Sequence, residues 1–508
     1  MKSRMLLVGC WLGLSTLPAW ATPPAARLTG SIEAGSDSPA APAESAQPSA
    51  EAPPNALPID LPAVLRLTNA SNPTIALARA RVDEAFNRFR EARSYWLPNL
   101  SAAIDYNRHD GTIQNAAGFV FNTNKQNLFY GAGAAFTWQL SDAIYGPLVA
   151  RQLMQAQSAA ARAVDNDVQL DAALAYLDLL RVYGQLAINA ETLAKAEEMQ
   201  QRAVSAERNG LGKTPADANR ARTETDIRRQ QRIDLEGQAA AASARLAQLL
   251  FIDPTVDLKP TDPAVLPIAL ISADSSLDDL LAVALMNRPE LAESRSLVQA
   301  AIASWRQARV RPYLPRFDFG YSGGDFGGGI NSELGSWGPR GDAYGQVTWE
   351  LQHMGFGDLF EARARQAQVA QANFRVSELT AQVGADVTTA YKVAAARART
   401  LQTAQHAVRQ AEVLWYRLEL AAFGVGGPAR QYDPLEPLLA EQALDQARSQ
   451  YLTEVIEFNR AQFRLYWALG RPPLDALPGA TAIPIDTPVL PTRKEMEPPR
   501  SPPGAARP

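Results

Sequence analysis

Histidine, cysteine and serine are the residues that most often form enzyme active sites or metal sites. Their spacing in this chain indicates neither an active site nor a metal site. The histidines stand far apart, and none forms a His-x-x-x-His or Cys-rich spacing that would hold a metal ion: His109, His353 and His406. The only cysteine is Cys10. We therefore expect no enzymatic activity, no cofactor and no metal site.

Residues 1–21 predict a secretory signal peptide. Two basic residues precede an apolar run over 5–14, and Ala19 and Ala21 complete an A-x-A cleavage site. Cys10 could mark a lipid-attachment box, but the apolar run before it is short. Cleavage after Ala21 leaves a mature chain without cysteine, which suits an exported protein that needs no disulfide.

Composition narrows the classes of partner. The formal net charge is -4 and there is no basic block, which argues against nucleic acid. After the signal peptide no window approaches the roughly 20 apolar residues of a membrane-spanning helix, so any crossing would need strands closed into a barrel. The segments 22–58 and 478–508 are predicted to be disordered.

The body of the chain consists of two copies of one unit, 59–273 and 274–477. Short landmarks recur in the same order in both copies: Tyr95–Leu100 and Pro312–Phe317, Thr137–Leu140 and Thr348–Leu351, Ala175-Tyr176 and Ala390-Tyr391. Each unit is predicted to hold a helix, a β-hairpin and a long helical hairpin. The β-hairpins span 98–140 and 314–351, and the helical hairpins span 144–251 and 356–469.

The predicted β-strands alternate an apolar face with a polar or small one. In the first strand Leu100, Ala102, Ile104 and Tyr106 form the apolar face. This alternation is typical of a barrel wall between lipid and water. Polar loops would join the strands over 109–126 and 323–341. Four strands cannot close a barrel, because known barrels begin at about eight strands, so we expect a trimer that shares about 12.

Aromatic residues at the ends of these strands are predicted to form a membrane-interface belt, although ordinary core positions would also suit them: Trp138, Trp349, Tyr313 and Tyr344.

The helical hairpins are far longer than a compact domain requires. Small and apolar residues recur in steps of three and four along nearly glycine-free runs, which favours coiled-coil packing with most charged residues in solvent. A helix of some 65 residues spans roughly 100 Å. Each run ends in a glycine-containing turn, at 209–215 and 423–428, before a returning helix. The segment 253–273 would form a small belt at mid-height.

This combination resembles the TolC-type outer membrane efflux protein family. The resemblance rests on residues spread over the whole body: Leu97-Pro98, Leu314-Pro315, Pro289–Leu291, Trp138, Trp349, Gly210-Leu211, Asp217 and Arg460–Gly470. It implies an α+β membrane protein, a homotrimer with a shared 12-stranded β-barrel in the bacterial outer membrane and a long periplasmic α-helical barrel. Cargo, either small molecules or exported polypeptide, would pass through this exit duct without chemistry.

The resemblance also implies partners and sites. A periplasmic adaptor protein, and through it an inner-membrane pump, would complete a tripartite efflux or type I secretion system. The adaptor would dock at the helix-tip turns: Gly210, Leu211, Gly212, Thr214, Gly424, Val425 and Gly426. The acids nearest the family's periplasmic aperture are Asp433 and Glu436. The spacing departs from the family's pattern here, and the helix dipole alone would also favour acids at a helix start.

The main rival is a periplasmic coiled-coil adaptor or structural protein without a barrel. The alternating aromatic strands argue against it. A hydrolase tethered to the cell surface is disfavoured by the missing catalytic constellation.

Overall fold

The structure is a computed structural model that describes residues 56–208, 215–262, 264–272, 274–331, 333–423, 435–479 and 481–482. All of these belong to one compact unit, which begins at Pro53. The signal peptide and most of the segment 22–58 lie outside the described residues.

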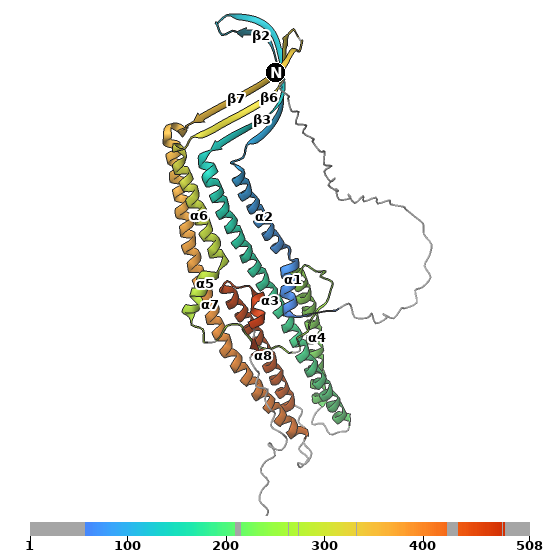
Figure 1. The fold of residues 1–508 in the computed structure, drawn as a ribbon. Coiled ribbons are helices and arrows are strands. Elements are labelled where there is room, and N and C mark those ends of the chain that lie inside the picture. The colour runs from blue at the N-terminus through green and yellow to red at the C-terminus, as the bar shows by residue number, and fades with distance from the viewer. Residues whose placement is uncertain are drawn as a thin grey trace, which may run out of the picture. The chain divides into compact units, whose positions relative to one another are not determined.

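The same order of elements occurs twice (Figure 1). The first series is β1 (Leu57–Ile59), α1 (Leu61–Ser71), α2 (Pro73–Ser94), β2 (Asn99–Gln114), β3 (Val120–Gln139), α3 (Leu140–Arg208), α4 (Pro215–Leu250) and β4 (Leu258–Pro260). The second is β5 (Ile268–Ala269), α5 (Leu277–Asn287), α6 (Pro289–Val310), η1 (Arg311–Tyr313), β6 (Arg316–Ile330), β7 (Gly335–Thr348), η2 (Gln352–Gly355), α7 (Phe356–Phe423), α8 (Leu435–Ala468), η3 (Pro473–Gly479) and β8 (Thr481–Ala482).

Capping residues set the boundaries between the short helices. Asp60 accepts a hydrogen bond from the Ala63 amide at 2.7 Å and starts α1. Asn72 ends α1 and caps α2 by accepting from the Thr74 amide at 2.8 Å. Proline stands at the first position of both α2 and α6, where its fixed φ suits a helix start. Each repeat therefore breaks its leading helix at the same place.

Four strands form one antiparallel sheet in the order β2-β3-β6-β7. The strands are longer than the apolar alternation indicates. The loops predicted over 109–126 and 323–341 are mostly paired strand, and only 115–119 and 331–334 connect β2 to β3 and β6 to β7. Pairing satisfies backbone groups whatever the side chains, so polar residues extend the ladder beyond the apolar part.

The long helices lie side by side below the sheet in Figure 1. At 69 residues α3 spans about 100 Å. Helix α2 packs on the half of α3 nearest the sheet and α4 on the far half; α6 and α8 flank α7 in the same way (Figure 1). The largest buried cluster lies where α1, α3, α4 and α8 meet, around Tyr176, Leu246 and Phe463.

The segment between α4 and α5, residues 251–276, crosses the long helices and is called the belt below. Asn459 of α8 holds it with both ends of its side-chain amide: Nδ2 donates to the Leu266 carbonyl at 2.9 Å, and Oδ1 accepts from the Ile268 amide at 2.7 Å. Gln462 accepts from the Leu270 amide at 3.2 Å. These two side chains, both largely buried, supply hydrogen-bond partners for backbone groups of the belt.

At Gly184 of α3, a side chain of α8 packs closely against the helix backbone. A Cβ at this position would lie 2.8 Å from a methyl carbon of the buried Leu452.

We expect Gly184→Val to destabilise the packing by about 1–3 kcal/mol through overpacking. In α7 a Cβ at Gly384 meets nothing within 4 Å. Gly384→Val is the matched control and should leave thermal unfolding, followed by circular dichroism, unchanged or slightly raised. Equal Tm values for the two variants would contradict the close approach.

Candidate functional site

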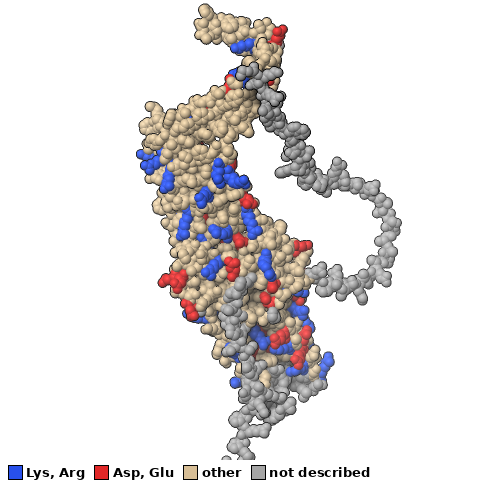
Figure 2. All heavy atoms as spheres, in the orientation of Figure 1, with Lys and Arg blue, Asp and Glu red and all other residues tan. Residues whose placement is uncertain are grey.

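The sheet has two chemically distinct faces. Residues paired across antiparallel strands point to the same side. One row joins Leu100, Ala134, Tyr321 and Ala343, and the next joins Ser101, Gly133, Ser322 and Asp342. The first row belongs to an apolar face and the second to a polar one, as the alternation predicts. In Figure 2 the visible side of the sheet next to the helices carries few charged groups, whereas the helices carry many.

The apolar face is uncovered in the described chain. Leu100 is 82% exposed and Ile104 is 80% exposed. Soluble proteins rarely expose contiguous apolar patches larger than a few hundred Å². In addition, β2 and β7 each pair with only one neighbour among the described strands, so both edges present free backbone groups. A single chain therefore leaves both its apolar face and its sheet edges without partners.

The four aromatic residues predicted at the strand ends fall into different environments. Trp138 is half-buried against Trp96 and Phe136, with ring centroids 6.2 and 5.3 Å apart. Tyr313 in η1 and Trp349 just after β7 are exposed where the sheet meets the helices.

Tyr344 lies on the other face. It pairs with Gly320, in the row of Asn99 and Ala135, and its ring covers Gly320 so closely that a Cβ there would lie 2.3 Å away. The signal for this was present in the sequence, because Tyr344 is an odd number of residues from Val347.

Most residues predicted at the helix tips lie outside the described residues: Gly210, Leu211, Gly212, Thr214, Gly424, Val425, Gly426 and Asp433. Glu436 belongs to the first turn of α8. The adaptor-docking turns and the aperture residues therefore stay predictions.

A buried ionic network joins α3, α4 and α8 on the side of the hairpins away from the sheet. The Arg228 side chain is 8% exposed; its Nε donates to Glu224 at 2.9 Å and its guanidinium also pairs with Asp445 of α8. Gln442 of α8 donates to the other oxygen of Glu224 at 3.0 Å, and Asn189 of α3 donates to the Arg228 carbonyl at 3.3 Å. Charged residues on these helices were expected mostly in solvent, and this group is not.

A second arginine connects α8 to both of its neighbours. Arg448 donates to Glu191 of α3 at 3.0 Å and to Glu412 of α7 at 3.3 Å. Glu191 also pairs with Lys195, and these partners hold the pKa of the Glu191 carboxyl below its usual value. The position of α8 between the two long helices is thus specified by ion pairs as well as by apolar contacts.

Glu441 makes this region sensitive to pH. It is 5% exposed, and burial raises the pKa of its carboxyl to about 7, against the opposing effect of Lys195 and Arg228. The packed state therefore binds more protons than the unfolded chain between roughly pH 4.5 and 7, so stability falls as pH rises through that window. Above this pH window the free energy of unfolding stays lower by a constant amount, roughly 3 kcal/mol.

We expect Glu441→Gln to remove this part of the pH dependence. The difference in apparent Tm between pH 5 and pH 8 should shrink relative to wild type. Glu236→Gln, at an exposed position of α4, is the control and should leave the difference unchanged. An unaltered pH profile in Glu441→Gln would contradict the burial of the ionised form.

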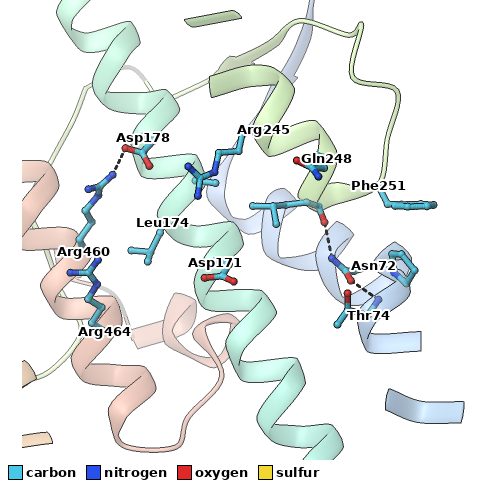
Figure 3. A pocket seen from close by; sticks show the side chains of 13 residues that line it. Asn72, Thr74, Asp171, Leu174, Asp178, Arg245, Gln248, Phe251, Arg460 and Arg464 are labelled. Atoms are coloured by element: carbon cyan, nitrogen blue, oxygen red, sulfur yellow. Dashed lines mark hydrogen bonds and ion pairs between the residues drawn. The ribbon is translucent and has the colours of Figure 1, made fainter. Parts of the chain in front are cut away.

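A polar pocket of about 600 Å³ lies between the α1–α2 junction, α3, α4 and α8 (Figure 3). Arg460 reaches across it to Asp178, and Asn72 donates to the Leu249 carbonyl at 2.9 Å. Charges of both signs line its walls. The Arg460–Asp178 pair ties the two repeats together, whereas the Asn72 contact lies within the first repeat. The polar groups of this pocket are not specific to one ligand.

Two negative findings apply to the described residues only. No cluster of three or more histidine, cysteine or acidic side chains there could hold a metal ion. No helix in the same part of the chain is both long and apolar enough to span a membrane.

The amino-acid sequence of the first repeat matches a known protein family. Residues 64–250 match the family described as outer membrane efflux protein. The resemblance inferred from the sequence is thereby confirmed, and the chain carries an outer membrane efflux protein domain over these residues. No curated protein matches the chain in sequence.

Solved structures match the fold over both repeats. The outer-membrane channel OprN is 18% identical, with a TM-score of 0.65, 81% of this chain and 89% of that chain being covered. The outer membrane protein VceC of Vibrio cholerae is 17% identical, with a TM-score of 0.63 and coverage of 81% and 96%. The open MtrE outer membrane channel of Neisseria gonorrhoeae is 18% identical, with a TM-score of 0.62 and coverage of 81% and 89%. The chain therefore shares the fold of these channels.

Proposed function

We propose that this chain is one subunit of an outer-membrane exit duct that extends into the periplasm and conducts cargo passively. The observation that carries the proposal is a four-stranded sheet, apolar on one face and open at both edges, joined directly to helices of about 100 Å. Lipid against the apolar face would remove its exposure to water. Copies of the sheet at both edges would pair the free backbone groups.

Three copies of the chain would close their sheets into one barrel. Four strands per chain make 12 in a trimer, an even number within the range of outer-membrane barrels. A cyclic trimer repeats one β7-to-β2 contact three times and leaves no open edge. The polar face, with its many glycine and serine residues, would then line a water-filled lumen.

The helical part would continue the duct into the periplasm. Its far end would meet an adaptor protein at the tip turns, and the adaptor would join it to an inner-membrane pump of a tripartite efflux or type I secretion system. The family match over 64–250 and the fold shared with outer-membrane channels support this assignment.

Mass and conductance test the proposal together. The mature chain purified in detergent is expected to have the mass of three subunits and to produce stepwise ionic current in planar lipid bilayers. A water-soluble monomer without current would overturn it and favour a periplasmic coiled-coil protein.

The narrowest point of the duct is proposed at Asp433 and Glu436. Replacing both by alanine should raise single-channel conductance or weaken block by multivalent cations, because a ring of carboxylates from three subunits would be lost. Glu236→Ala, at an exposed position of α4, is the control. Conductance and block equal to wild type in the double variant would exclude these two residues.

A further inference from the structure

Arginines gather on four helices where these helices join the sheet. Helices α2 and α6 end at the sheet, and α3 and α7 begin at it. The parts of these helices nearest the sheet contain ten arginines against four acidic residues, over 86–94, 140–162, 299–310 and 356–375. Figure 2 shows blue groups, Lys and Arg, over the helices directly below the sheet. This end of the helices therefore carries a surplus of positive charge, although the net charge of the whole chain is -4.

Six of these arginines are exposed and are called the arginine collar below: Arg90 and Arg93 of α2, Arg151 of α3, Arg306 and Arg309 of α6, and Arg363 of α7. Among the described residues none of the six side chains forms an ion pair or a hydrogen bond. Arg311 of η1 differs, because it is half-buried and pairs with Asp358 at 2.8 Å and with Glu361 at 3.0 Å. Arg311 thus joins α6 to α7, whereas the collar has no acidic partner in the described part of the chain.

Aromatic rings support four of the six collar arginines. Their guanidinium carbons lie 5.8–6.0 Å from the centroids of rings three or four residues earlier in the same helix: Arg90 over Phe86, Arg93 over Phe89, Arg309 over Trp305 and Arg363 over Phe360. A ring covers only one flat side of a guanidinium, so the N–H groups at its edge stay free to donate. These four side chains are therefore held ready for an acceptor from outside the chain.

The collar lies close enough to the sheet to reach a membrane surface when the apolar face of the sheet meets lipid. Arg93 stands six residues before β2 and Arg309 seven residues before β6, so their backbones are roughly 10 Å from the sheet. Headgroups extend about 5–8 Å beyond the hydrocarbon, and charges attract over about 8 Å more at physiological salt. The exposed Tyr313 and Trp349 lie between the sheet and the collar, as aromatic residues do at the edge of the hydrocarbon.

The helix dipole accounts for only part of the collar. Arg93 and Arg309 stand in the last turns of α2 and α6, where the partial negative charge of the helix end favours a cation. Arg363, in contrast, is seven residues from the N-terminus of α7, the end whose partial charge is positive, and Arg151 lies about three turns into α3. A cause common to all six arginines therefore lies outside the individual helices.

We propose that the arginine collar binds the phosphate groups of anionic phospholipids in the membrane leaflet next to the helices. The inference rests on the proposed function, because it requires the sheet to lie in a bilayer. Two phosphate oxygens accept parallel hydrogen bonds from the edge of one guanidinium, a geometry that lysine cannot supply. Attraction to an anionic surface favours binding by a factor of about five per arginine. The collar thereby fixes the depth of the sheet in the membrane.

Quenching of tryptophan fluorescence by brominated lipid tests the collar in the trimer reconstituted in bilayers. Trp305 lies under Arg309 and reports on lipids bound there. Brominated phosphatidylglycerol and brominated phosphatidylcholine, each diluted with unbrominated lipid, give the affinity of the protein surface for one lipid relative to the other. We expect wild type to prefer phosphatidylglycerol about five-fold at low salt and less at high salt. A triple variant with Arg93→Gln, Arg309→Gln and Arg363→Gln should bind both lipids equally.

A matched variant removes the same charge at the other end of the helices. Arg222→Gln, Arg229→Gln and Arg232→Gln replace exposed arginines of α4, and together they should leave the wild-type preference unchanged. Lysine at the three collar positions keeps the charge but loses the planar fork, so its preference should lie between those of wild type and the glutamine variant. Equal preference in wild type and the glutamine variant of the collar would overturn the proposal.

Mass and current separate this inference from the proposed function. A wild-type protein that is a conducting trimer but has equal affinity for the two lipids overturns the collar alone. A wild-type protein that forms no trimer and carries no current overturns both. Loss of trimeric mass by the glutamine variant of the collar in lipid-free detergent would show that these arginines bind a neighbouring copy of the chain, and would also overturn lipid binding.

Discussion

Replacing Ile104 by arginine is expected to prevent most of the protein from integrating into the membrane. Ile104 is 80% exposed in the middle of the apolar face of β2. If this face meets lipid, an arginine near the bilayer midplane costs about 2–4 kcal/mol per subunit, and a trimer incurs the cost three times. Carbonate extraction of cell envelopes measures the result, with the variant moving from the membrane pellet to the soluble fraction.

The neighbouring residue supplies the control. Ala103 pairs with Gly131 and belongs to the polar face of the sheet, so Ala103→Arg adds the same charge toward the proposed lumen. We expect Ala103→Arg to stay in the pellet as a trimer with altered ion selectivity. Wild-type retention of Ile104→Arg, or equal loss of both variants, would contradict lipid contact at the apolar face.

Removing the guanidinium of Arg228 is expected to be the most destabilising single change in the helices. Arg228→Ala leaves Glu224 and Asp445 largely buried without their cation. Breaking a buried ion pair in this way costs roughly 3–5 kcal/mol, because the remaining charges stay desolvated. Hydrogen exchange should increase in α4 and α8 around this network, and the apparent Tm should fall.

Arg229 is the matched control one residue further along α4. Its side chain is 52% exposed, and its partners Glu197 and Asp226 are also exposed. An exposed pair contributes about 0–1 kcal/mol, so Arg229→Ala should be close to wild type. In a triple variant with Arg228→Met, Glu224→Leu and Asp445→Leu, apolar packing should recover much of the stability. Equal Tm values for Arg228→Ala and Arg229→Ala would contradict the buried network.

The periodicities of the sequence predicted the elements well. Alternation over Leu100–Tyr106 indicated a strand with one apolar face, and the register continues that face in the row of Leu100, Ala134, Tyr321 and Ala343. In the row of Ile104 it also places Asp325, whose carboxylate accepts a hydrogen bond from the Tyr130 hydroxyl at 3.0 Å. Long glycine-poor runs with small residues in steps of three and four predicted helices that the structure extends to 69 residues in α3 and 68 residues in α7. Both signals are local, because side-chain direction repeats with a fixed period along each element.

Strand length was harder to predict. The polar residues over 109–126 indicated a loop, yet β2 and β3 continue through most of this range. Backbone pairing depends on the position of the partner strand and not on apolar side chains, so it extends where alternation stops.

The repeat, the strands, the long helices and the likeness to outer membrane efflux proteins could all be predicted from the sequence, because each rests on residue types at short, regular spacings. The sequence did not indicate which charged residues are buried and which surfaces stay open, because both depend on the tertiary structure. Arg228 and Arg229 are adjacent in one helix, but only Arg228 meets α8, because the helix turns by about 100° between them. Likewise Tyr176 and Tyr391 stand at the same place in the repeat, and only the path of the belt distinguishes the buried one from the one at an open groove. Burial depends on which faces of distant segments meet, and short spacings do not contain that information.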